Sequence, residues 1–343
     1  MHPLLSPRIL FVRTAGAAVG LALVMLVCTL VGSESISLKS ALSGGREMGQ
    51  ANPDYEILMR IRIPRVILAA IVGAALAAAG VTLQALLHNP LADPYILGIS
   101  SGAGLGATLA IIGGVQWTLW GRSPVALFAF AGAIGTVWLV WTVGRTTGRF
   151  HITGLLLAGV VVNAFFSAII MFLISIARGQ ELHATMFWLM GNMAEEDSFV
   201  LWIGTGCVAA GITSLYFLAP QLNAVSFNPT DARSMGIHVE RVQLTALAVA
   251  AFVTAVAVSL SGLVGFVGLV VPHAVRLVLG PDHRQLLPIG SLCGAMFLVV
   301  ADTVARVVVA PAQLPVGVVT AIVGGPFFLF LLIRYNRKVS WLR

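Results

Sequence analysis

The sequence predicts an all-α, polytopic membrane protein with about ten transmembrane helices and both termini in the cytoplasm. Composition is the first observation behind this prediction, because 58% of the 343 residues are hydrophobic and only 10% are charged. Soluble domains carry about 25% charged residues, so a soluble fold is excluded. The second observation is a series of apolar runs close to the ~20 residues that a helix needs to cross a bilayer. The third is an unequal distribution of charge between the two ends of these runs.

The apolar runs set the expected boundaries of the helices. They cover about 9–32, 63–87, 95–113, 124–144, 152–176, 198–218, 241–260, 264–279, 286–305 and 314–333. The eighth run is short and interrupted by glycine. The first run is too long for a signal peptide and has no small-residue cleavage site, so we expect it to be a retained helix. No linker or soluble domain is evident, and we expect residues 1–343 to form one transmembrane domain.

The distribution of charge predicts the orientation of the chain. An even number of spans places both termini on one side of the membrane. If that side is the cytoplasm, it holds twelve of the 20 Lys and Arg residues but only four of the 13 Asp and Glu residues. The positive-inside rule favours this arrangement. The net charge of +7 therefore follows from the topology and indicates no nucleic-acid partner.

Nucleotide binding by this chain is not expected. Its lysines are Lys39 and Lys338, and neither lies in the Walker motif GxxxxGK[ST], so any ATP would be hydrolysed by another chain. The glycine-rich segment 98–106 lacks that lysine and lies in an apolar run. Gly98, Gly102 and Gly106 recur every four residues there, a pattern typical of closely packed membrane helices.

Catalytic and metal sites are not expected either. The three cysteines lie singly within apolar runs and are interpreted as small core residues. They are Cys28, Cys207 and Cys293. No nucleophile–base pair appears in any span, so an enzyme is disfavoured and no resident cofactor is expected.

Arginines are predicted at the outer ends of two spans. Arg62 and Arg65 are three residues apart at the start of the second span, where Pro64 fits the first helical turn, and Arg306 ends the ninth. One interpretation is that they anchor the helices by reaching the lipid headgroups. The other is that they are docking points for acidic residues of an external partner, because the positive-inside rule disfavours arginine on this side.

An inner loop at 227–242 predicts a short helix followed by a turn and a new helix. Asn228-Pro229 interrupts the preceding span, and Thr230 or Asp231 can cap a short helix. Gly236 can end that helix in a left-handed turn, and the next helix begins near His238. This segment is either a surface for a protein partner or an ordinary structured loop.

A second inner segment, NPLADP at 89–94, predicts a sharp corner between two spans. Its two prolines disfavour a continuous helix. The side chains of Asn89 and Asp93 can accept hydrogen bonds from exposed backbone groups. The corner has a structural explanation without any further function.

Polar residues inside spans are candidates for function by default. Asn163 and Ser167 lie on the fifth span, and Asp302 lies four residues before Arg306, a spacing that predicts an ion pair. His273 follows a proline and is expected to bond a carbonyl that the proline frees. No second histidine lies at ligand spacing, so a metal site is disfavoured. The outer segment 183–193 is expected to be an interfacial helix or one wall of an external mouth.

Eight ordered motifs together resemble the FecCD family, the membrane permeases of type II ABC importers for ferric siderophores, haem and vitamin B12. They are RIPR (62–65), QALLHNPLADPYILGISSGAG (84–104), LLLAG (155–159), ARSMGI (232–237), GFVGLVVPH (265–273), DHRQLLP (282–288), ADTVAR (301–306) and LPVGVVTAIVGGPFF (314–328). The resemblance covers nearly the whole chain. It implies import of an iron chelate (ferric siderophore or haem) or cobalamin from the periplasm across a bacterial inner membrane by alternating access.

The resemblance also implies partners. A second permease copy would form a homodimer, or a related chain a pseudo-symmetric heterodimer, with the pathway at the interface near Asn163 and Ser167. Two cytoplasmic ATPase subunits would hold ATP and magnesium, and a periplasmic substrate-binding protein would deliver the cargo. Arg62, Arg65 and Arg306 match positions that meet glutamates on the two lobes of that binding protein.

The inner segments match the coupling and gating regions of the family. The coupling helices correspond to about 228–240. The coupling residues implied are Asn228, Thr230, Asp231, Ala232, Arg233, Ser234, Met235 and Gly236. Asn89 and Leu91 match an inner gate. The second gate precedes LLLAG, where relatives usually carry small hydroxyl residues; this chain departs from that pattern with His151, Ile152 and Thr153.

A proton-coupled secondary transporter is the main alternative. It would use Asp302 or His273 as a proton relay. Secondary carriers often place paired charges near the middle of the membrane, whereas the charges here lie near span ends. A channel is disfavoured because no charged ring or selectivity-filter loop is evident.

Overall fold

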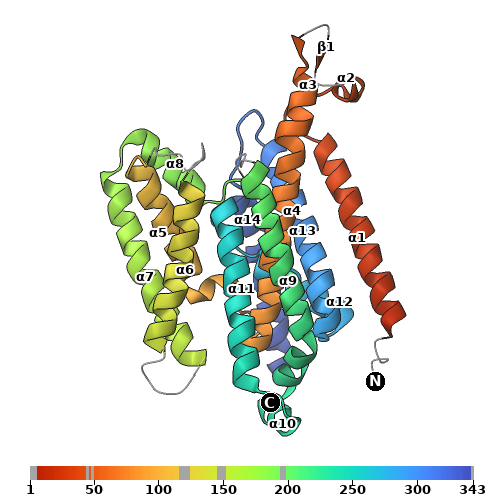
Figure 1. Cartoon of the computed structure of the whole chain (residues 1–343), viewed down its shortest axis with the longest axis vertical. Coiled ribbons are helices and arrows are strands. Elements are labelled where there is room, and N and C mark those ends of the chain that lie inside the picture. Colours follow the sequence, from red (N-terminus) through yellow and green to blue (C-terminus); the bar gives the residue numbers. More distant parts are fainter. Residues whose placement is uncertain are drawn as a thin grey trace.

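The computed structural model describes residues 6–43, 46–47, 50–115, 124–144, 152–193 and 198–340, and these residues are mainly helical (Figure 1). Seven helical segments are long and apolar enough to cross a membrane. They are α1 (Pro7–Leu30), α3 to α4 (Pro53–Leu86), α6 (Val125–Gly144), α7 (Ile152–Ile176), α9 (Ser198–Phe227), α11 (Val239–Ser261) and α13 (His283–Val307). Three further apolar helices are shorter: α5 (Ile99–Ile112), α12 (Val267–Leu279) and α14 (Val316–Ser340), the last apolar over Val316–Phe330. The predicted all-helical membrane fold is confirmed.

Short elements lie between these helices. The outer connection after α1 contains α2 (Leu38–Leu42), a small hairpin of β1 (Arg46–Glu47) and β2 (Gln50–Ala51), and α3 (Pro53–Glu56). A π-helical segment η1 (Ile57–Arg62) joins α3 to α4 (Ile63–Leu86) without a break. The others are η2 (Pro94–Leu97), α8 (Gly179–Leu189) and α10 (Pro229–Ser234). The first turn of α1, the end of α14 and α10 lie at one end of the molecule, and α2, α3 and α8 at the other (Figure 1).

The helices form two groups, and α4 is the central helix of the larger group. α4 packs against α9, α11, α12 and α13, while α5 packs between α6 and α7 (Figure 1). Three predicted boundaries are wrong by several residues. The second segment begins at Pro53 rather than near 63, and α14 ends at Ser340 rather than near 333. The span predicted to end near 218 continues as α9 to Phe227 despite the internal Pro220. A proline removes one helical hydrogen bond, but neighbouring helices can satisfy the freed group inside a membrane protein.

Glycine sets the distances between the central helices. A Cβ at Gly73 would collide with the Gly294 carbonyl of α13, and one at Gly80 with the Gly268 carbonyl of α12. In the other group, Gly102 and Gly106 lie equally close to carbonyls of α6. The close packing predicted from the four-residue glycine spacing is therefore confirmed for these two positions.

Two connections between long helices contact each other in the structure. The Tyr95 hydroxyl of η2 donates to the Val264 carbonyl at 2.9 Å and accepts from the Val264 amide at 3.0 Å. Val264 lies in the connection between α11 and α12, and Tyr95 lies in the connection between α4 and α5. Irregular backbone inside a membrane protein needs such internal partners, because lipid offers none.

Candidate functional site

A buried charge cluster lies at the end of the helices that the charge distribution predicts to face outward. The Arg65 guanidinium of α4 contacts both carboxylate oxygens of Asp302, with Nε 3.1 Å from each and Nη2 3.0 Å from Oδ1. Arg306, one turn further along α13, donates from Nε to Oδ2 of Asp302 at 3.0 Å. The Asp302 side chain is 1% exposed and that of Arg306 7%. The ion pair predicted from the spacing of Asp302 and Arg306 is confirmed, and Arg65 is a second partner that the sequence did not reveal.

Arg62 is also buried, but its partners are backbone carbonyls. Its Nη1 donates to the carbonyls of Thr29 at 3.4 Å and Leu30 at 3.1 Å, and its Nη2 donates to the carbonyl of Glu34. The last carbonyls of a helix have no partner within it, so Arg62 satisfies the end of α1. A Cβ at Gly32 would collide with this guanidinium. Arg62 therefore joins the end of α1 to the start of α4.

The three arginines predicted to dock a partner lie at the same end of the molecule, yet each of them already has hydrogen-bond partners within the chain. Arg65 retains the most exposure, 12% of its side chain, and its Nη1 donates to the side-chain oxygen of Gln313 at 2.9 Å. Three guanidinium groups face the Asp302 carboxylate and the exposed Glu34, so the cluster keeps a net positive charge. Docking stays a prediction, and any partner carboxylate would have to share donors that Asp302 already engages.

The inner loop contains the predicted short helix. α10 spans Pro229–Ser234, Gly236 follows with φ +81°, and α11 begins at Val239. The cap differs from the prediction: the Asn228 side chain, not that of Thr230 or Asp231, accepts from the Thr230 amide at 2.9 Å. Asn228 can do so because its backbone is extended while Pro229 occupies the first helical turn.

The surface of α10 is suited to a protein contact. Ala232 is 1% exposed and fixes the helix against its neighbours, whereas Met235 is 74% exposed. Arg233 and Glu240 form an ion pair at 3.5 Å with both side chains largely exposed. α10 lies at the extreme end of the molecule, beyond the neighbouring ends of α12 and α13 (Figure 1). An exposed methionine at such a tip is an adaptable apolar contact.

The NPLADP corner is held by its own side chains, as predicted. Asn89 Oδ1 accepts from the Leu91 amide at 2.9 Å, and Asp93 Oδ1 accepts from the Tyr95 amide at 2.8 Å. Asn89 is exposed and Leu91 is half-buried. Burial raises the pKa of the Asp93 carboxyl, although the hydrogen bond from the Tyr95 backbone opposes the shift.

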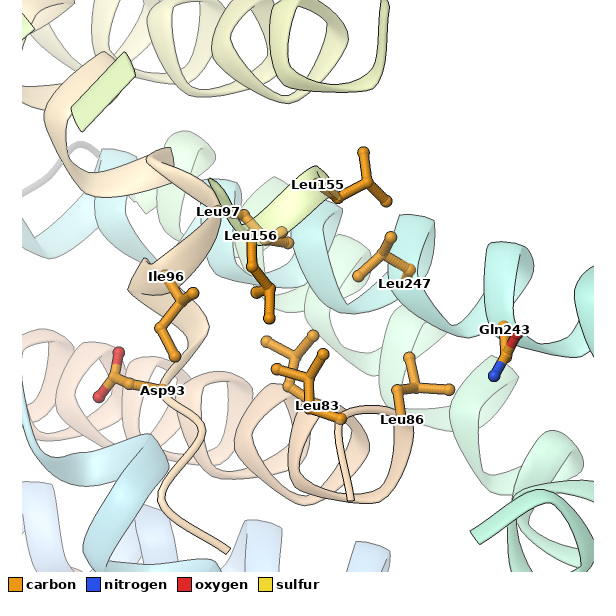
Figure 2. Close-up of a pocket in the computed structure, with 10 residues that line it drawn as sticks. Leu83, Leu86, Asp93, Ile96, Leu97, Leu155, Leu156, Gln243 and Leu247 are labelled. Atoms are coloured by element: carbon orange, nitrogen blue, oxygen red, sulfur yellow. The ribbon is translucent and has the colours of Figure 1, made fainter. Parts of the chain in front are cut away.

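Leucines close the space behind this corner. The leucines come from α4, η2, the start of α7 and α11, and the Asp93 carboxylate points away from them (Figure 2). They are Leu83, Leu86, Leu87, Leu97, Leu155, Leu156 and Leu247. The enclosed volume is about 10 Å³. That is roughly the space of one water molecule, so the region is closed to a solute of any size.

The leucine cluster lies between the two predicted gate segments. Leu155 and Leu156 follow the predicted second gate within the first turns of α7. Of that gate, His151 lies outside the described residues, and the backbone of Ile152 and Thr153 is helical. Sequence reasoning missed the leucines because apolar residues in a span carry no signal that separates a gate from the core.

The predicted pathway residues lie on a helix with little cover. Asn163 is exposed and Ser167 half-buried on α7, whose apolar side chains Leu157, Phe165 and Met171 are 68%, 62% and 71% exposed. Exposed apolar side chains also line α14, where Ile322 is 67% exposed. Lipid or a second chain must cover these faces.

A metal site finds no support near His273. Its Nδ1 is buried without a hydrogen-bond partner among the described residues, so the bond predicted to a freed carbonyl is not formed through that atom. Arg276 lies one turn along α12, with Nε and Nη2 also unpartnered. A neighbouring guanidinium disfavours a bound cation. Within the described part of the chain, no group of three His, Cys, Asp or Glu residues is arranged to hold a metal ion.

The segment after α7 is helical, which is compatible with both alternatives expected for it, an interfacial helix and one wall of an external mouth. α8 spans Gly179–Leu189, and the Glu181 side chain accepts from the Arg178 amide at 3.1 Å at its start. Met186 and Met190 are 42% and 38% exposed. The chain after α8 is fixed by backbone hydrogen bonds from Val316 and Gly317, so α8 is joined to the start of α14.

Comparison with known proteins gives consistent matches. Residues 6–334 match the FecCD transport family. The chain is 41% identical to the cobalamin import system permease protein BtuC of Halobacterium salinarum, over 86% of this chain and 78% of the relative. It is 37% identical to the hemin transport system permease protein HmuU of Yersinia pestis, over 94% and 96% of the two chains. It is 36% identical to the Fe(3+) dicitrate transport system permease protein FecD of Escherichia coli, over 82% and 86%.

The fold agrees with these sequences. A solved structure described as an inward-facing conformation of a putative metal-chelate type ABC transporter superposes with a TM-score of 0.78 at 30% identity, covering 96% of this chain and all of that chain. The family match over residues 6–334 includes the buried arginine cluster, the corner and α10. The chain is thus a membrane-embedded permease subunit that belongs to the FecCD transport family.

Proposed function

We propose that this chain is the permease of an ABC importer that moves a large metal chelate, either an iron chelate such as a ferric siderophore or haem, or cobalamin, into the cytoplasm. The observation that carries the proposal is α10, a capped helix with an exposed tip at the end of the molecule where the positive-inside rule places the cytoplasm. The relatives named for cobalamin, hemin and ferric dicitrate support the cargo class and leave the individual cargo open.

The proposed assembly has two copies of this chain in a bacterial inner membrane. The exposed faces of α7 and α14 would meet across the dimer interface and line the pathway, with Asn163 and Ser167 facing it. Two separate ATPase subunits would grip α10 and bind ATP and magnesium, since this chain has no Walker motif. Their closure would move α10 and α11 and switch the access of the pathway.

The outer charge cluster would receive a substrate-binding protein. Its net positive charge attracts an acidic surface, and Arg65 is the most exposed of the three arginines in the cluster. Asp302 fixes the direction of the Arg65 and Arg306 guanidinium groups before the partner arrives. The proton-coupled alternative gains nothing here, because Asp302 is held between two guanidinium groups.

The test is ATP hydrolysis by the chain reconstituted in lipid with its ATPase, with and without the loaded binding protein. We expect the loaded binding protein to stimulate hydrolysis, and Arg65→Gln to reduce that stimulation at least about fivefold, as expected for a charge pair worth ~1 kcal/mol or more. Arg60→Gln is the matched control, since Arg60 is 73% exposed and pairs locally with Glu56. Failure of any ATPase to associate would overturn the importer and favour the secondary carrier.

A further inference from the structure

A groove between α1, α9 and α13 is a second candidate binding site, remote from the outer charge cluster and from α10. Its volume is about 420 Å³, within the range of roughly 300–1,000 Å³ typical of ligand pockets. It is lined by Pro7, Leu10, Phe11, Thr14, Ile212, Thr213, Tyr216 and Pro288. These residues belong to the first turns of α1, the second half of α9 and the second turn of α13. The groove therefore opens near the end of the molecule at which α1 begins.

The Thr14 hydroxyl in this groove lacks a partner. Threonine in a helix usually donates to the carbonyl four residues back, as Thr29 does to Met25 at 2.7 Å and Thr82 to Ala78 at 2.9 Å. Thr14 lines the groove, and its Oγ1 is buried without a hydrogen-bond partner among the described residues. An unsatisfied buried hydroxyl is costly, so an acceptor from a ligand would stabilise it.

Two arginines flank the groove residues of α1 along the sequence: Arg8 follows Pro7, and Arg13 precedes Thr14. Arg8 is exposed and forms no ion pair within the part of the chain that the structure describes. Arg13 donates from Nη1 to the Gln285 side-chain oxygen at 2.9 Å, an uncharged acceptor that leaves its charge uncompensated. The first turn of α1 carries no acid. A mainly apolar groove that includes the unpartnered Thr14 hydroxyl, with two arginines close by in the sequence of α1, fits an amphiphile with a negative head.

We propose that the groove binds an anionic phospholipid of the cytoplasmic leaflet. The acyl chain lies along Leu10, Phe11 and Ile212, the Thr14 hydroxyl donates to an ester carbonyl, and Arg8 and Arg13 face the phosphate. The orientation agrees with the predicted cytoplasmic start of α1, because the two arginines then lie at the level of the headgroups. Lipid is favoured over a protein partner because α1 has little protein cover along its most apolar window, in which no residue is buried.

The test compares phosphatidylglycerol with phosphatidylcholine of the same acyl chains, added to the full chain purified in a mild detergent. Bound lipid is counted by native mass spectrometry, and stabilisation is followed by thermal unfolding. We expect tighter binding of phosphatidylglycerol. Arg8→Gln should lower its advantage about fivefold, since one arginine near a headgroup contributes on the order of 1 kcal/mol. Thr14→Val should weaken the binding of both lipids.

Leu10→Trp fills the groove and should prevent retention of the lipid, whereas Leu23→Trp, 58% exposed elsewhere on α1, should not. Equal binding of both lipids, unchanged by any of these variants, would identify ordinary bilayer contact and overturn the proposal. A photocrosslinking residue at Phe11, 73% exposed, should capture lipid in native membranes. Capture of a polypeptide instead would assign the groove to a protein partner and equally overturn the proposal.

Discussion

At the scale of single residues, the arginines at the outer end differ in what holds them. Arg306 lies four residues from Asp302 on one helix, so the sequence alone indicates their contact. The Arg65–Asp302 contact joins residues 237 positions apart and depends on the packing of α4 against α13. Arg62 bonds carbonyls, which no side-chain pattern reveals. Sequence spacing predicts pairs within a helix, whereas contacts between helices require the fold.

Arg62 provides the first prediction. Arg62→Gln should destabilise the chain by about 2 kcal/mol or more, because hydrogen bonds from a charged donor contribute roughly 1.5–3 kcal/mol each. The loss should concentrate at the end of α1, as faster hydrogen exchange near residues 31–35. Arg60→Gln, two residues away on the exposed surface, should change little. Equal effects of the two changes would show that the carbonyl contacts of Arg62 are unimportant.

Asp93 provides a prediction about pH. Its ordinary pKa of 3.8 is raised in the folded chain, so its ionised form is disfavoured by burial and the folded state loses stability as pH rises through the interval above 3.8. Asp93→Asn keeps the acceptor for the Tyr95 amide and removes the charge, so it should be at least as stable as the wild type at pH 7. Asp93→Ala loses the cap and should cost about 1 kcal/mol.

Thermal unfolding in detergent between pH 4 and pH 7 separates these effects, with the pH range chosen around the ordinary value of 3.8. The wild type should become less stable over this range relative to Asp93→Asn. A wild type that gains stability relative to Asp93→Asn as pH rises would contradict the assigned direction of the shift.

At the scale of elements, most helices follow from apolar length, and the exceptions have physical reasons. The predicted run 152–176 coincides with α7, because its ends are also the ends of its apolar stretch. α9 extends past its predicted end because helical geometry continues through Pro220 into a polar segment. The residue that caps α10 is Asn228 rather than Thr230 or Asp231, because a proline at the next position fixes the start of the helix.

Glycine positions provide the prediction at this scale. Gly80→Ala should destabilise the chain by several kcal/mol, because the new methyl group would meet the Gly268 backbone and α4 would have to move away from α12. Gly16→Ala is the matched control: nothing lies within 4 Å of its added methyl group. That change should be neutral or stabilising by up to about 1 kcal/mol from helix propensity. Thermal unfolding of both variants compares them directly.

At the scale of the whole molecule, the orientation in the membrane remains a prediction from charge. Leu42 and Met235 lie at opposite ends of the molecule, and their side chains are 72% and 74% exposed. With the native cysteines replaced, we expect a membrane-impermeant thiol reagent to label Leu42→Cys in intact spheroplasts and Met235→Cys only after permeabilisation. The reverse pattern would invert the topology and with it the proposed roles of both ends.

The whole molecule also shows where sequence reasoning about function stops. The motifs identify the family, and the family identifies the ends that partners would approach. The sequence did not predict the leucine cluster behind the corner, where Leu86, Leu155 and Leu247 come together from three separate helices. The groove along α1 was not predicted either, because it too is formed by residues from three helices. No local pattern in an apolar chain distinguishes such a convergence from ordinary packing.

The attachment of α1 has a consequence for how the chain is assembled during synthesis. α1 is synthesised before α13, yet α13 is the helix that it packs against most among the described elements. Until then its partner among these helices is α4, and its mean hydropathy of 2.1 with no residue of that window buried suits it to remain largely in lipid. Its permanent bonds, from Arg62 at one end and to Gln285 at the other, form at different times. A helix made well before α13 is thus secured at both of its ends only once α13 has packed against it.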